Sequence, residues 1–131
     1  MTVLWDTSGV VAFVRADDPH HGEAVACLRW LERNRWRLVL TNFIWSEVYA
    51  LLLSRASPDV ARRWLRENPM APERVTEADE ARARTILLTY EDKDFSYVDA
   101  TSFAVMERLA IDTAFTFDTH FRQYGWKQLT G

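Results

Sequence analysis

Short apolar runs alternate along the chain with longer stretches in which apolar residues recur every three or four positions. The short runs predict strands at residues 2–5, 37–41, 113–117 and 126–129, with a further short strand at 73–76. The stretches with helical spacing predict helices after residue 8, at about 18–33, 43–55, 76–89 and 96–109, and from residue 57 until Pro69 and Pro72 stop it. The polar segment 91–95 is expected to be a loop.

Residues that commonly cap helices stand where these helices are predicted to begin. Two segments have the spacing of a capping box, in which an acid follows a hydroxyl residue after three positions: Thr76-x-x-Asp79 and Ser96-x-x-Asp99. Two others combine a cap with a proline that suits the first helical turn: Asp18-Pro19 and Ser57-Pro58. The periodicity and the caps therefore agree on the order of the elements.

Strands that alternate with helices of ten or more residues are typical of a parallel sheet covered by helices on both faces, an α/β fold. The chain has 131 residues, of which 48% are hydrophobic, which suits one sizeable core. We therefore expect a single domain over residues 1–131. In such sheets, ligands bind just beyond the carboxyl ends of the strands.

Four acidic residues are predicted to meet at that edge of the sheet. Asp6 directly follows the first strand and Asp118 follows the strand over 113–117, while Glu47 lies in the second turn of one predicted helix and Asp99 in the first turn of another, both among apolar neighbours. Four carboxylates in one crevice repel one another unless a cation neutralises them. Hard oxygen donors of this kind favour Mg²⁺, with Mn²⁺ as an alternative.

Each acid also has a purely structural explanation. Asp6 suits a helix cap, Asp99 the acidic position of a capping box, and Asp118 a turn after a strand. Glu47 has a basic neighbour along the helix in Arg55. Only the joint occurrence of these acids at one predicted edge favours a metal site over four separate structural roles.

Composition and missing motifs exclude several classes of protein. The formal net charge of −3 argues against a strong overall positive field, although clustered arginines such as Arg62, Arg63 and Arg66 suit phosphate contacts or a solvated helix face. Cys27 is the only cysteine and is expected in the core, which excludes an internal disulfide and fits a reducing cytoplasm. No signal peptide or membrane span is expected. The chain contains no GxGxxG, GxxxxGK[ST] or GxSxG motif, and Ser8 stands where dehalogenase-like phosphatases place a second aspartate.

Four segments carry a family resemblance, each centred on one of the acids: 4–12, 41–48, 95–104 and 114–121. In their order and spacing they resemble the acidic motifs of PIN domains, and within that family the chain is most similar to the VapC-type toxins of type II toxin–antitoxin pairs. The resemblance implies a PIN-like α/β/α sandwich, endoribonuclease activity and a small antitoxin protein as partner. It also implies that the metal-binding acids are Asp6, Glu47, Asp99 and Asp118, with orienting roles for Ser8 and Thr116.

The sequence departs from this family at one position. Many relatives place another acid just after the last motif, where this chain has Thr119 and His120. Asp94 is a candidate substitute, although a loop acid of this kind is commonly only solvated. His120 suits either a phosphate contact or a turn, and we interpret His20 and His21 as ordinary surface residues.

A metal-dependent ribonuclease that uses water as nucleophile should leave a 5′-phosphate and a 3′-hydroxyl, and RNA with an exposed loop is the expected substrate. The alternative is a non-catalytic PIN-like module that binds RNA or protein, although a negative pocket does not help a protein to bind polyanions. Aromatic and leucine side chains on two successive helices predict a homodimer interface or an antitoxin groove, unless they are core residues: Trp45, Tyr49, Leu52, Leu53 and Trp64.

Overall fold

The computed structural model describes residues 1–68 and 71–130, and its centre is a parallel sheet with the strand order β2-β1-β3-β4. The strands are β1 (Thr2–Trp5), β2 (Arg37–Val39), β3 (Thr113–Phe115) and β4 (Lys127–Gln128). Each neighbouring pair is parallel, with Leu4 of β1 opposite both Val39 and Ala114. Because the chain leaves β1 toward β2 and later returns to β3 on the other side, the sheet has its switch point beside β1.

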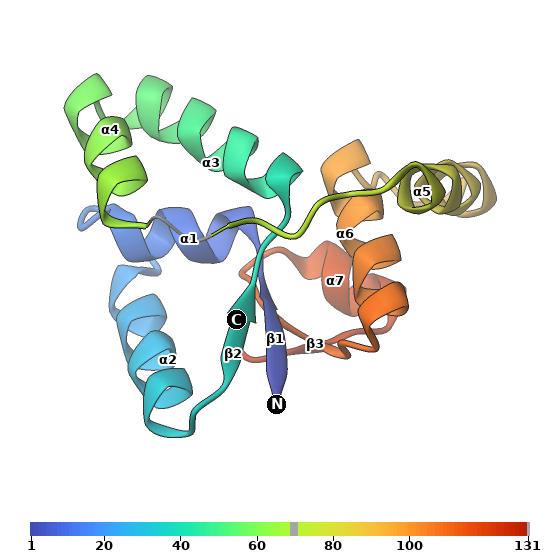
Figure 1. The fold of residues 1–131 in the computed structure, drawn as a ribbon, viewed down its shortest axis with the longest axis horizontal. Coiled ribbons are helices and arrows are strands. Elements are labelled where there is room, and N and C mark those ends of the chain that lie inside the picture. The colour runs from blue at the N-terminus through green and yellow to red at the C-terminus, as the bar shows by residue number, and fades with distance from the viewer. Residues whose placement is uncertain (69–70, 131) are drawn as a thin grey trace.

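Helices cover both faces of this sheet, as the sequence predicted. They are α1 (Thr7–Val14), α2 (His21–Arg33), α3 (Asn42–Arg55), α4 (Pro58–Glu67), α5 (Glu77–Thr89), α6 (Tyr97–Leu109) and α7 (Thr119–Tyr124). In Figure 1, α1 and α2 lie on one side of the strands and α5, α6 and α7 on the other, while α3 and α4 form a hairpin above α1. The predicted α/β sandwich is confirmed. None of the helices within the described ranges combines the length and the apolar character that crossing a membrane requires.

The core is built on the two central strands. Val3 and Leu4 of β1 and Ala114 and Phe115 of β3 are fully buried, which explains why these strands are almost entirely apolar rather than alternating. Helix α6 packs deeply against them, since its residues from Asp99 to Met106 are all buried. Both predicted capping boxes form, at Thr76 before α5 and at Ser96 before α6. The carboxyl end of β1, the start of α1 and the start of α6 lie close to one another (Figure 1).

Several predicted boundaries differ from the structure. Helix α2 begins at His21 because Asp18 accepts a hydrogen bond from the backbone of His20 and stabilises a turn instead of capping the helix. The expected strand at 73–76 is only a bridge between Thr41 and Glu73. Helix α4 ends at Glu67, and Pro69 lies outside the described residues. We did not predict α7, which is only six residues long.

Most of the aromatic cluster expected to form an interface belongs to the core. Trp64 and Leu52 are buried, and the ring of Trp45 lies 4.5 Å from that of Trp64. Of the five residues, only Leu53 is clearly exposed, at 44%. The alternative that these residues belong to the core therefore holds for Trp64 and Leu52, while Trp45 and Tyr49 are half-buried, and the homodimer or antitoxin interface stays a prediction. Packing between α3 and α4 absorbs the large rings.

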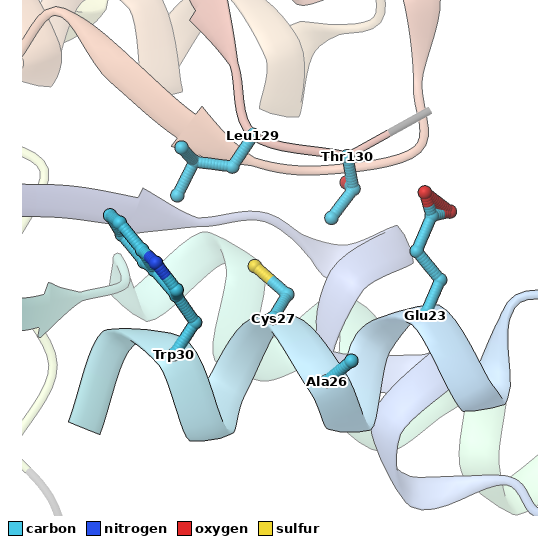
Figure 2. A pocket seen from close by; sticks show the side chains of 6 residues that line it. All are labelled: Glu23, Ala26, Cys27, Trp30, Leu129 and Thr130. Atoms are coloured by element: carbon cyan, nitrogen blue, oxygen red, sulfur yellow. The ribbon is translucent and has the colours of Figure 1, made fainter. Parts of the chain in front are cut away.

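Cys27, expected in the core, is only half-buried and faces a cavity of about 360 Å³ between α2 and the end of β4. Figure 2 shows its sulfur directed toward Leu129 and Thr130, with Trp30 at one side. Burial, followed by the nearby Glu23 carboxylate, raises the pKa of the Cys27 thiol to about 11. The thiol is therefore protonated at neutral pH and a poor nucleophile.

Gly9 and Gly22 provide a paired test of this packing. A Cβ atom on Gly9 would lie 2.6 Å from the backbone oxygen of Phe115, so α1 can approach β3 only with glycine there. Gly22 has no heavy atom within 4 Å of the corresponding point. We predict that Gly9→Ala lowers the free energy of unfolding by about 1–3 kcal/mol, because the backbone must shift. Gly22→Ala should raise it by about 0.5–1 kcal/mol through helix propensity.

Urea denaturation of both variants measures the difference. Equal stability of Gly9→Ala and Gly22→Ala would contradict the close approach of α1 to β3. Gly22→Ala is the matched control, since both glycines are helical and the substitution is identical.

Candidate active site

A cleft of about 440 Å³ opens beyond the carboxyl ends of β1 and β3. All four acids singled out from the sequence line it: Asp6, Glu47, Asp99 and Asp118. They come from four different elements, which are the end of β1, the second turn of α3, the first turn of α6 and the start of α7. The structure therefore brings together the residues that the sequence placed at this edge.

Asp6 is the most buried of the four acids, with 3% of its surface exposed. It stands at the N-cap position of α1, yet its side chain makes no capping hydrogen bond, so a cap does not explain it. Burial, which outweighs a hydrogen bond from Thr116, and the negative charges of Asp99 and Asp118 raise its pKa from 3.8 to about 7. A carboxyl group held in this way gains from a nearby cation.

Ser8 and Thr116 hold the Asp6 carboxylate in place. The Thr116 hydroxyl donates to Oδ2 of Asp6 at 2.8 Å, and the Ser8 hydroxyl donates to the same oxygen at 3.1 Å. Each hydroxyl oxygen also accepts a backbone N–H, from Phe117 to Ser8 at 2.9 Å and from Asp118 to Thr116 at 3.0 Å. This network joins the end of β1 to the end of β3 and fixes the direction of the acid.

Asp99 has both of the roles considered for it. Its Oδ2 accepts the backbone N–H of Ser96 at 3.0 Å, which completes the capping box of α6, and the same oxygen lies 2.8 Å from Nδ1 of His120. Burial and the charge of Asp118 raise the pKa of Asp99, against the lowering effects of Ser96 and His120. The cap fixes the position of a carboxylate that still faces like charges.

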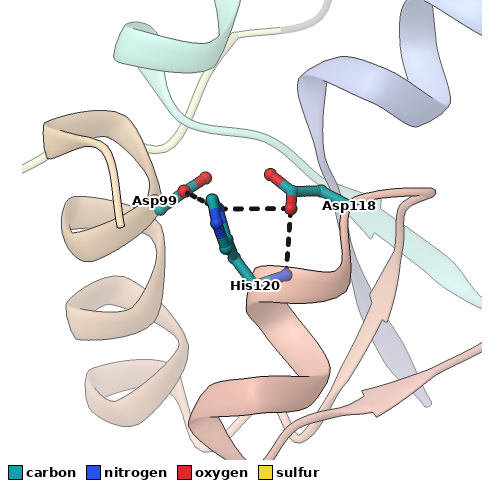
Figure 3. Close-up of side chains that lie close together, drawn as sticks. All are labelled: Asp99, Asp118 and His120. Carbon is teal, nitrogen blue, oxygen red and sulfur yellow. Dashed lines mark hydrogen bonds and ion pairs between the residues drawn. The ribbon is translucent and has the colours of Figure 1, made fainter. Parts of the chain in front are cut away.

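His120 lies among three acids, as Figure 3 shows for two of them. Its Nδ1 is 2.8 Å from Asp99 and 3.2 Å from Asp118, and its Nε2 is 2.9 Å from Asp94. Burial would lower the pKa of His120, but Asp99, Asp118 and Asp94 together raise it. The raised pKa favours the imidazolium, which places positive charge directly against Asp99, Asp118 and Asp94.

Atoms that can bind a metal lie within 4.8 Å of one another on Asp99, Asp118 and His120. Asp6 and Glu47 line the same cleft outside this closest group. Arg55 also lines the cleft, but among the described residues no ion pair joins it to Glu47. An ion pair with Arg55 therefore does not explain the position of Glu47.

Two histidines lie at this cleft, and the sequence placed only His120 near the site. His20, interpreted as a surface residue, is exposed but lines the cleft with its ring stacked on that of Phe117. His120 forms three acid contacts that neither a simple turn nor a phosphate contact describes. A histidine two positions after an expected metal-binding aspartate was the available signal for His120; nothing local in the sequence indicated His20.

The donor set fits a hard divalent cation. The ligands available in the cleft are mainly carboxylate oxygens, as Mg²⁺ and Mn²⁺ prefer, and burial together with the charges of Asp99 and Asp118 raises the pKa of Asp6. The nitrogen of His120 is better suited to Mn²⁺ than to Mg²⁺. In chemical terms, the cleft is able to hold a cation beside a negatively charged substrate.

The family model for the PIN domain matches residues 3–127. The chain belongs to the PIN-domain family. Among PIN-domain proteins, it is 33% identical to the "23S rRNA-specific endonuclease VapC20" of Mycobacterium tuberculosis, with 97% of each chain covered. It is 31% identical to a "VapC ribonuclease" of Archaeoglobus fulgidus, with 98% of this chain and 88% of that protein covered. The resemblance seen in the four acidic motifs is thereby confirmed.

Solved structures agree with this assignment. The crystal structure of M. tuberculosis VapC20, described as a toxin that cleaves the sarcin–ricin loop, superposes with a TM-score of 0.86 at 27% identity, covering 98% of this chain and 99% of that one. FitAcB from Neisseria gonorrhoeae superposes with a TM-score of 0.70 at 19% identity, covering 98% and 96%, and supports the fold alone. The PIN fold is therefore shared along nearly the whole chain.

The raised pKa of Asp6 predicts how stability depends on pH. Between its unfolded value of 3.8 and its folded value of about 7, the folded protein holds a proton that the unfolded chain releases. The contribution of Asp6 to stability is therefore full below pH 4 and is lost as the pH rises toward 7, at about 1.4 kcal/mol per pKa unit. Asp6→Asn keeps an oxygen that accepts hydrogen bonds from Ser8 and Thr116. Because asparagine does not ionise, the variant does not lose stability at this position as the pH rises.

We expect Asp6→Asn to be more stable than wild type at pH 8 in the presence of a chelator, with the difference shrinking toward pH 4. Thermal melts over this pH range measure it. Asp92→Asn, at an exposed loop position, is the control and should show no such trend. The same difference in melting temperature between Asp6→Asn and wild type at all pH values would show that the pKa of Asp6 is not raised in the folded protein.

Proposed function

We propose that the protein is a Mg²⁺- or Mn²⁺-dependent endoribonuclease and the toxin of a toxin–antitoxin pair. The observation that carries this proposal is the convergence of Asp6, Glu47, Asp99 and Asp118 on one cleft, with Asp6 buried at a raised pKa. Relatives named as an rRNA endonuclease and a ribonuclease, aligned along nearly the whole chain, support the same reaction.

In this proposal the four acids hold the cation, and the other cleft residues position them. A bound cation would neutralise the cluster, polarise the phosphoryl oxygens and lower the pKa of the attacking water. Ser8 and Thr116 orient Asp6, and the capping box with Ser96 fixes Asp99. A carboxylate of the cluster accepts the proton of the attacking water. The P–O3′ bond breaks and the departing 3′ oxygen takes a proton from solvent, so that the products carry a 5′-phosphate and a 3′-hydroxyl.

The proposed substrate is RNA with an exposed single-stranded loop. Such loops present unstacked bases and an accessible backbone. The sarcin–ricin loop of 23S rRNA is the first candidate, because it is the target stated for the structural relative with a TM-score of 0.86.

An antitoxin protein is the proposed partner, a homodimer the proposed assembly and the cytoplasm the proposed compartment. The description of that structural relative as a toxin supports the antitoxin partner.

Substitution of the acids tests the site. Glu47→Gln and Asp118→Asn each remove one negative charge with almost no change in volume. We expect each to lower the rate of RNA cleavage on the order of 100-fold or more, while the melting temperature in chelator stays at or above that of wild type. Glu67→Gln, an exposed acid at the end of α4, should cleave at the wild-type rate.

Cleavage is measured on a loop-containing RNA with Mn²⁺ or Mg²⁺, and the ends of the products are mapped. Wild-type activity in both cleft variants would refute the assignment of the site. RNA binding without cleavage by the wild-type protein, across a broad panel of RNAs, would favour the non-catalytic module instead.

Metal binding has a separate readout in thermal stability. A cation that binds only the folded protein adds about 2.7 kcal/mol when its concentration is a hundred times Kd. We therefore expect millimolar Mn²⁺ to raise the melting temperature by roughly 5 °C or more. Asp99→Asn should show a much smaller shift, because it keeps the cap but loses a charge. Equal shifts in Asp99→Asn and wild type would mean that Asp99 serves only as a helix cap.

A further inference from the structure

The rings of His20 and Phe117 form a stacked pair on the wall of the acidic cleft. Their centroids are 4.4 Å apart and their planes differ by 13°, which is close to parallel stacking. Both residues line the cleft that holds the four acids, and Phe117 directly precedes Asp118. The pair joins the turn before α2 to the segment after β3, two parts of the chain that are far apart in sequence.

Both members of the pair are held by hydrogen bonds of the main chain. The N–H of Phe117 donates to the Ser8 hydroxyl at 2.9 Å, within the network that orients Asp6. The N–H of His20 donates to the Asp18 carboxylate at 2.8 Å. The ring of Phe117 is also in edge contact with Phe115 of β3, at 6.5 Å. The wall therefore has a fixed position relative to the acids.

His20 offers an exposed ring at the cleft. The residue is exposed although its ring stacks on that of Phe117, whereas Phe117 itself is half-buried. An exposed flat ring backed by a second ring is an arrangement on which proteins stack an unpaired base. Phe117 also packs against the core, whereas His20 belongs neither to the core nor to the acid cluster.

The charge of the cleft makes such a contact useful. Asp6, Asp99 and Asp118 repel the phosphates of RNA, and a single bound cation attracts only the phosphate next to it. Contacts that do not depend on charge add affinity for the neighbouring nucleotides without competing for that cation. Stacking of a base is such a contact, and it depends weakly on salt.

We propose that the His20–Phe117 pair is a stacking platform that holds one unpaired base of the RNA beside the scissile phosphate. This proposal rests on the ribonuclease function proposed above and extends it to the positioning of the substrate. His20 supplies the exposed ring face, and Phe117 supports it from behind. The platform fixes the nucleotide next to the phosphate that faces the acids.

Variants of His20 separate stacking from the other properties of histidine. His20→Ala removes the ring, His20→Gln keeps a polar side chain without a ring, and His20→Phe keeps a ring without charge or polarity. We expect KM for a loop RNA to rise by roughly 5- to 100-fold in His20→Ala and His20→Gln, with kcat changed less than about twofold. His20→Phe should restore KM to within about threefold of wild type. Trp30→Ala, which removes an exposed ring outside the cleft, is the control and should leave KM unchanged.

A binding measurement tests the stack directly. RNA carrying 2-aminopurine in its loop is titrated into Glu47→Gln, which is expected to bind without cleaving, and into the same variant with His20→Ala. Stacking should quench the fluorescence in the first protein and not in the second. The ratio of the two dissociation constants should be the same at 50 mM and 200 mM salt, as expected of an uncharged contact and not of a phosphate contact.

The outcomes distinguish this proposal from the proposed function. If wild type cleaves RNA while His20→Ala keeps both its KM and the fluorescence quenching, the pair only ties two segments together and the platform is refuted. If His20→Gln restores KM and His20→Phe does not, the role is a hydrogen bond and the platform is refuted too. If wild type cleaves no RNA, the nuclease proposal fails, and quenching that depends on His20 then decides the platform alone. Thermal melts of all variants confirm folding.

Discussion

Burial of the Asp6 carboxyl group at the junction of β1 and β3 is the constraint on which the rest of the site depends. The group lies where two central strands end, and hydrogen bonds from the hydroxyls of Ser8 and Thr116 and from the backbone of Thr7 compensate in part for its lost hydration. Their oxygens in turn position the backbone of Phe117 and Asp118. The carbonyl of Thr116 accepts from Gln128 and Thr130, which connects the last strand to the same point. One unfavourable charge is thus surrounded by an ordered set of polar contacts.

The same electrostatic problem explains His120. Crowded carboxylates raise one another's pKa, and a protein that must also be stable without metal gains from a positive group among them. His120 contacts Asp94, Asp99 and Asp118 and supplies that group from the short helix α7. The family resemblance implied another acid just after the last motif, where this chain has Thr119 and His120 and so less negative charge. Asp94 reaches the cluster through His120, a role in which it supports the histidine rather than replacing the missing acid.

The fold and the four acids were predictable because both follow from local rules. The spacing of apolar residues predicted that strands alternate with helices. Acids directly after strands or near the starts of helices were therefore expected to meet at the carboxyl edge of the sheet. Asp99 was ambiguous between cap and site because it is both. Trp64 and His20 were misplaced because their burial and contacts come from α3–α4 packing and from a stack between distant segments. Helix α7 was missed because six residues with one fully buried ring give no helical period.

The hydrogen bond between Asp6 and Thr116 spans 110 positions of the chain. During synthesis on the ribosome, Asp6 emerges long before the strand that buries it and the hydroxyl that orients it. A growing polypeptide therefore carries the first acid in water, at its ordinary pKa and without its neighbours, until residues beyond 116 have left the exit tunnel. Nuclease competence of the proposed kind cannot arise before Thr116 has emerged and reached Asp6. For a toxin, this order of assembly delays any activity until most of the domain has been synthesised.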